Sequence, residues 1–90
     1  MEDKVFLYAL EKKTALIEKL KKLVSCPSVG ADPKMFQGME SARKCIETWL
    51  NEMGFKNLRR LELSKGSGQP VIYAERLDSP KKPTIIVYAH

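Results

Sequence analysis

His90, the only histidine in the sequence, is the residue best suited to chemistry. An imidazole can bind a metal ion, and it can take up or release a proton near neutral pH. It follows the segment Pro83-Thr84-Ile85-Ile86-Val87-Tyr88-Ala89. A short apolar run that is rich in β-branched residues and preceded by proline predicts a strand buried on both faces. In open α/β sheets, functional sites form beyond the carboxyl ends of such strands, so His90 is the first candidate site residue.

The two cysteines, Cys26 and Cys45, are the other candidates for reactive or metal-binding groups. They lie far apart in the sequence and fit neither a zinc-finger spacing nor a CxxC motif. The opening residues lack the basic and apolar pattern of a secretory signal. We therefore predict a cytoplasmic protein in which both thiols are reduced. Cys45 falls near the apolar stripe of a predicted helix, where a cysteine commonly acts as a small hydrophobic residue.

The first half of the chain contains the periodicity of two amphipathic helices. From about Asp3 to Val24, apolar residues recur at three- and four-residue spacings and share one face. Residues 25–33 include two prolines and a glycine, and they are predicted to form a loop.

The second helix is expected to run to Met53. Asp32 before a proline has the form of an N-cap, and Gly54 stands where a left-handed residue ends many helices. Gly38 lies inside the segment and is expected to delay the start of the regular helix.

Three strands are predicted in the second half. The segment 57–63 alternates apolar and charged residues, which is typical of a strand near a sheet edge. The segment 71–77 is the second strand, and 84–90 is the last. The polar segment 64–70 contains Gly-Ser-Gly, which favours a hairpin turn over an anion-binding loop. A second polar turn is expected at 78–83.

Composition and charge narrow the range of partners. The chain is 43% hydrophobic and 30% charged, which is ordinary for a soluble globular protein. The net charge of +5 suits an anionic partner. However, the lysines are interleaved with acidic residues, and neither an RNA-recognition signature nor a Gly-rich phosphate loop is found. No run approaches the roughly 18 apolar residues of a membrane span. We therefore expect neither a nucleic acid nor a membrane as partner.

The order helix, helix, strand, strand, strand predicts an α/β fold. Two helices can cover one face of a three-stranded sheet, but the last strand needs cover on both faces. Ile85 and Val87 point to one side of it, and Ile86 and Tyr88 point to the other. We therefore expect residues 1–90 to be the N-terminal part of one larger α/β domain, whose remainder is their partner.

Three segments match a known pattern in order and spacing: Ser25-Cys26-Pro27-Ser28-Val29, similar to an I-P-S-V stretch; Trp49-Leu50 with Gly54-Phe55, similar to W-L…L-G-F; and Thr84–His90, similar to a strand that ends in Y-G-H-x-D. Over essentially its whole length, the chain thus resembles the N-terminal segment of the co-catalytic di-zinc metallopeptidases. This family includes dipeptidases, carboxypeptidases, aminoacylases, acetylornithine deacetylase and succinyl-diaminopimelate desuccinylase, and the dipeptidase branch is the most similar. Ala89 stands where the family usually has glycine.

The resemblance implies a metallopeptidase, a dipeptidase-type hydrolase that cleaves dipeptides or N-acyl amino acids with metal-activated water. It implies a catalytic domain in which a mixed sheet lies between helices in a three-layer α/β/α architecture. It also implies a smaller lid domain, absent from residues 1–90, through which family members often form homodimers. Two zinc ions, replaceable by cobalt or manganese, are the implied cofactors. His90 aligns with a zinc ligand, and it is the only functional residue that carries over, so residues 1–90 alone are expected to be inactive.

Two other interpretations stay open. The chain can be a small basic α+β interaction module that binds an acidic protein or nucleic acid without catalysis, which predicts a functional lysine face and a dispensable His90. It can also be a family member that folds without catalysing. An acidic residue two positions after His90 would favour the peptidase. A stop codon there, with salt-sensitive binding to anionic polymers, would favour the module.

Overall fold

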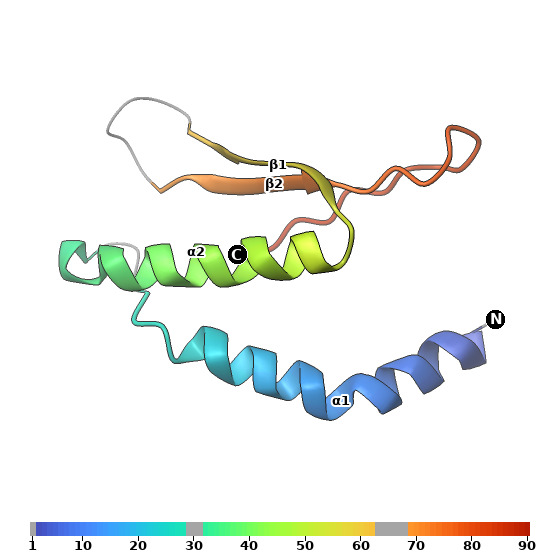
Figure 1. Ribbon diagram of the computed structural model, residues 1–90, viewed down its shortest axis with the longest axis horizontal. Coiled ribbons are helices and arrows are strands. Elements are labelled where there is room, and N and C mark those ends of the chain that lie inside the picture. The colour runs from blue at the N-terminus through green and yellow to red at the C-terminus, as the bar shows by residue number, and fades with distance from the viewer. Residues whose placement is uncertain (1, 29–31, 63–68) are drawn as a thin grey trace. The chain divides into compact units, whose positions relative to one another are not determined.

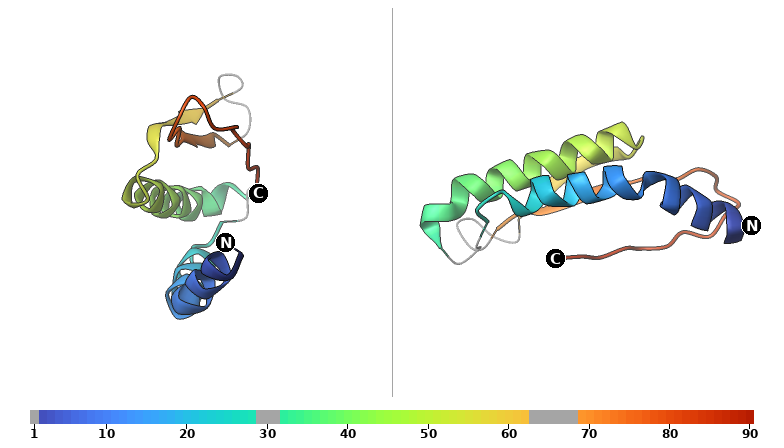
Figure 2. Two further views of the ribbon diagram at one scale, coloured as in Figure 1. Left: turned by 90° about the vertical axis from the view of Figure 1, so that its right-hand side faces the viewer. Right: turned by 90° about the horizontal axis from the view of Figure 1, so that it is seen from below.

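The computed structural model of the protein describes residues 2–28, 32–62 and 69–90. These residues form two α-helices, one short 3-10 helix and one pair of antiparallel strands (Figures 1 and 2). The α/β class predicted from the sequence is therefore confirmed. The chain divides into two compact units, Met1–Cys45 and Ile46–His90.

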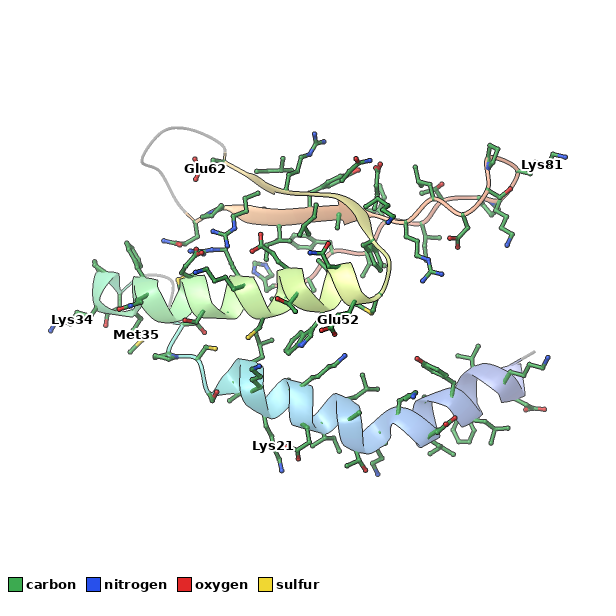
Figure 3. The ribbon with its side chains drawn as sticks, in the orientation of Figure 1. Lys21, Lys34, Met35, Glu52, Glu62 and Lys81 are labelled. Atoms are coloured by element: carbon green, nitrogen blue, oxygen red, sulfur yellow. The ribbon has the colours of Figure 1, made fainter. Side chains whose placement is uncertain are left out.

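The first unit opens with α1, Glu2–Val24, which matches the predicted bounds to within one residue. Lys21 and Lys22 lie in its last turn, where cations offset the negative pole of the helix. Figure 3 shows Lys21 pointing away from the helix axis. The amide of Ser25 donates to the carbonyl of Lys21 (3.0 Å), and the Ser25 hydroxyl donates to the carbonyl of Lys22 (2.6 Å). These two bonds satisfy carbonyls that the end of the helix leaves free.

The second helix begins with the predicted cap. The Asp32 carboxylate accepts a hydrogen bond from the amide of Lys34 (2.9 Å), and its carbonyl accepts one from the amide of Met35 (2.9 Å). Pro33–Met35 form a single 3-10 turn, and α2 continues as Phe36–Glu52. Proline at the first position is stable here because its missing amide hydrogen would have no partner in the helix.

Gly38 lies inside α2 rather than before it, so the expected later start of the helix is wrong. A Cβ atom at this position would lie 1.8 Å from the carbonyl oxygen of Pro27. The loop backbone therefore packs directly on the helix backbone, and only glycine leaves the space. The favourable contact offsets the low helix propensity of the residue.

The end of α2 has the predicted left-handed glycine. Gly54 has a φ of +84°. The Phe55 amide donates to the carbonyl of Leu50 (3.0 Å), and the Gly54 amide donates to that of Asn51 (3.1 Å). This pair of bonds is a Schellman motif, which closes the helix and turns the chain into the next strand.

The second unit contains a hairpin of β1, Lys56–Leu61, and β2, Val71–Glu75. Both strands lie within the predicted segments 57–63 and 71–77, apart from one added residue at the start of β1, and both end earlier. The predicted turn at 64–70 falls largely on residues 63–68, which lie outside the described residues. The register pairs Lys56 with Glu75 and Arg59 with Tyr73. Three steps along β1 thus oppose two along β2, which defines a β-bulge.

The described residues contain two strands, not the three that were predicted. The expected turn after β2 is present, because the Lys82 amide donates to the carbonyl of Ser79 (3.2 Å). The chain then reverses direction in Figures 1 and 2, and Lys81 in the turn points outward in Figure 3. Residues 83–90 make no ladder with either described strand and are exposed. A strand is defined by its hydrogen-bonded pairing with a neighbouring strand. An apolar, β-branched sequence favours the extended conformation, but it does not provide that neighbour.

No side chain of the described residues is fully buried. On α1, Leu10, Leu16 and Leu20 keep more than half of their surface exposed, and the apolar face of α2 is half-buried at most. Met39, the methionine within α2, is likewise only half-buried. A folded domain of this length normally encloses a contiguous apolar cluster. The described residues therefore present apolar surface for which they provide no cover.

Candidate functional site

His90, the residue singled out by the sequence, lies beside Tyr88 in an exposed extended segment. The Tyr88 hydroxyl is 3.2 Å from Nε2 of His90. The two ring centroids are 5.4 Å apart with planes inclined at 73°, an edge-to-face arrangement. Residues two apart in an extended chain point to the same side, which places the two rings together.

As a single metal ligand, His90 has suitable chemistry. A ligating histidine binds through one ring nitrogen and makes a hydrogen bond with the other, and here the contact with Tyr88 occupies Nε2 alone. A catalytic zinc needs about three protein ligands. Among the described residues, no group of three or more His, Cys, Asp or Glu side chains is positioned to hold a metal ion. These residues therefore fit one ligand position and do not build a zinc site.

The two cysteines do not join this site. Cys26 and Cys45 are free thiols, both half-buried, as expected for reduced cysteines. The Cys26 thiol donates to the carbonyl of Lys22 at 3.6 Å, in the last turn of α1. This weak bond gives Cys26 a local role at the end of the helix.

A second polar group, which the sequence did not single out, lies on the hairpin. It consists of Asn57, Arg59, Tyr73 and Glu75, hereafter the hairpin cluster. Tyr73 donates to Oε2 of Glu75 (2.7 Å), and the side-chain amide of Asn57 donates to Oε1 of the same carboxylate. Cζ of Arg59 lies 4.9 Å from the centroid of the Tyr73 ring, a cation–π contact. With Leu58, these side chains line an open hollow of about 480 Å³.

Local backbone geometry brings the hairpin cluster together. Asn57 has a φ of +53°, a left-handed conformation that asparagine tolerates better than most residues. It lies within the β-bulge, so its side chain is turned toward Glu75 on the partner strand. Tyr73 and Glu75 are two residues apart on β2 and share a face, and Arg59 is paired directly with Tyr73.

The hydrogen bonds set the protonation states of the hairpin cluster. The bond that Tyr73 donates to Glu75, and then the charge of Glu75, raise the pKa of Tyr73 above its ordinary value of 10.0. The bonds from Tyr73 and Asn57 lower the pKa of Glu75 below its ordinary value of 4.5. Glu75 is therefore ionised and Tyr73 neutral at neutral pH. A carboxylate that already accepts two bonds is suited to joining the strands and poorly suited to accepting a proton from a substrate.

A bidentate ion pair joins the hairpin to the second half of α2. Nε and Nη2 of Arg60 donate to the two carboxylate oxygens of Glu47 at 2.9 and 2.8 Å. Nη1 of Arg76 also donates to the carbonyl of Met53 (3.1 Å), in the turn that follows α2. The fork geometry of arginine makes such a pair more directional than a lysine contact. Because Arg60 and Arg59 are adjacent on β1, the hairpin cluster occupies the opposite strand face.

Comparison of the chain with models of protein families, with curated proteins and with solved structures gave no match. None of the three comparisons links the chain to the zinc peptidases, so that resemblance rests on the sequence segments alone. Across the described ranges, neither α-helix combines the length and the hydropathy that crossing a bilayer requires.

Proposed function

We propose that the chain is the N-terminal part of a zinc-dependent peptidase or related amidohydrolase, of the dipeptidase type, and that His90 is one of its metal ligands. The larger domain would have a three-layer α/β/α architecture, in which residues 84–90 form a central strand. Bound zinc ions would supply an acidified water and polarise the scissile carbonyl. Within this chain, the described helices and hairpin would serve as scaffold.

The observation that carries the proposal is the state of the apolar run before His90. Ile85, Ile86 and Val87 are 83%, 94% and 84% exposed, although all three are β-branched and suited to a buried strand. Fully burying a side chain of this kind is worth about 1.5–3 kcal/mol relative to leaving it exposed. A sheet edge and helices from further residues of the same domain would provide that cover and would place His90 at the end of a central strand.

The test uses the product of the complete reading frame that contains residues 1–90. We expect the purified protein to hold zinc, to hydrolyse dipeptides or N-acyl amino acids, and to lose activity on chelation and regain it with zinc, cobalt or manganese. In His90→Ala, we expect the bound zinc per chain to fall and hydrolysis to drop by at least about 100-fold, since loss of one ligand disrupts the paired site.

The matched control is Lys82→Ala, an exposed residue in the turn before the same segment. It should keep both zinc content and hydrolysis. If His90→Ala retained the zinc content and activity of the unmodified protein, His90 would not be a ligand and the proposal would be wrong. Salt-sensitive binding to anionic polymers, lost in a lysine variant and unchanged in His90→Ala, would instead identify an interaction module.

A further inference from the structure

We draw no further inference here: the strongest candidate, the apolar face of α1 on which Leu10, Leu16 and Leu20 stay more than half exposed, carries nothing because no feature of the described residues shows what covers it.

Discussion

At the scale of single residues, Glu75 shows how neighbours on a two-stranded sheet hold a carboxylate in its ionised form. Its two oxygens accept hydrogen bonds from Tyr73 and from Asn57, which reaches it because the bulge holds Asn57 in a left-handed conformation. The same bonds bring residues of both strands to one carboxylate. The hairpin cluster therefore links sequence positions 57 and 75, which no local pattern connects.

These bonds predict an abnormal titration of Tyr73. Its pKa is raised above 10.0, mainly because the phenol donates to ionised Glu75. In Glu75→Gln, we expect the Tyr73 titration to move back toward 10.0, since the acceptor charge is gone. The measurement is the phenolate absorbance of each protein during an alkaline titration, with Tyr73→Phe subtracted to isolate this tyrosine. An unchanged midpoint in Glu75→Gln would show that Tyr73 and Glu75 are not bonded in solution.

The same pair predicts the pH range in which the hairpin is stabilised. The pKa of Glu75 is lowered below 4.5, so its contribution is present above that value and is lost as the pH falls through the lowered pKa. The pKa of Tyr73 is raised, so its contribution is present below 10.0 and is lost as the pH rises through the raised pKa. We expect the amide-exchange protection of β2 in the unmodified protein to decline both at acidic pH, as Glu75 is protonated, and at alkaline pH, as Tyr73 ionises. In Glu75→Gln, protection should depend less on pH. The same pH dependence in both proteins would contradict the prediction.

At the scale of elements, the glycine at position 38 affects the stability of α2 in two opposing ways. Replacing a glycine inside a helix by alanine normally stabilises the helix by about 1 kcal/mol. Here the new methyl group would lie 1.8 Å from the Pro27 carbonyl oxygen, a backbone atom. The loop must therefore shift away from α2, and we expect Gly38→Ala to lower the free energy of unfolding by about 1–3 kcal/mol.

The measurement is urea denaturation followed by circular dichroism, with the product of the complete reading frame. Ser41→Ala is the control, because it also introduces alanine into an exposed part of α2, although it removes a bond of 3.1 Å to the Gln37 carbonyl. Its effect should stay within about 0.5 kcal/mol. A Gly38→Ala protein more stable than the unmodified one would mean that Pro27 does not pack against the helix.

Sequence patterns predicted the elements whose signals are local. The cap at Asp32 and the left-handed Gly54 depend on residues within one turn, and both are confirmed. The start of α2 was misplaced because the space around Gly38 is set by Pro27, eleven positions earlier. The third strand stays a prediction, because pairing of residues 84–90 depends on an edge that a local pattern cannot identify. The hairpin cluster was not identified from the sequence. Tyr73 and Glu75 are two residues apart and therefore share a face of β2, but only the strand register places Arg59 opposite Tyr73.

At the scale of the whole molecule, the described residues have well-formed elements and no enclosed core. The hydrogen bonds of α1, α2 and the hairpin are local or join adjacent elements, and their net contribution is modest because water competes for the same groups. Stability of a domain comes mainly from burial of apolar surface. Here the apolar faces of α1 and of residues 85–88 are exposed, so they contribute little of this stabilising term among the described residues.

Residues 1–90 alone are therefore expected to self-associate. Exposed apolar patches and an unpaired strand edge both promote association, and Ile86 is the most exposed large hydrophobic residue in the described part of the chain. In sedimentation velocity, we expect oligomers or aggregates that grow with concentration, and in zinc titration only weak binding.

Ile86→Lys should shift the distribution toward smaller species, because it removes apolar area and adds repulsion. Thr84→Lys adds the same charge one position before Ile85 without removing a large apolar side chain, so its effect should be smaller. A monodisperse monomer that unfolds cooperatively would show that residues 1–90 enclose a core of their own, and tight stoichiometric zinc binding by that monomer would show that they contain a complete metal site.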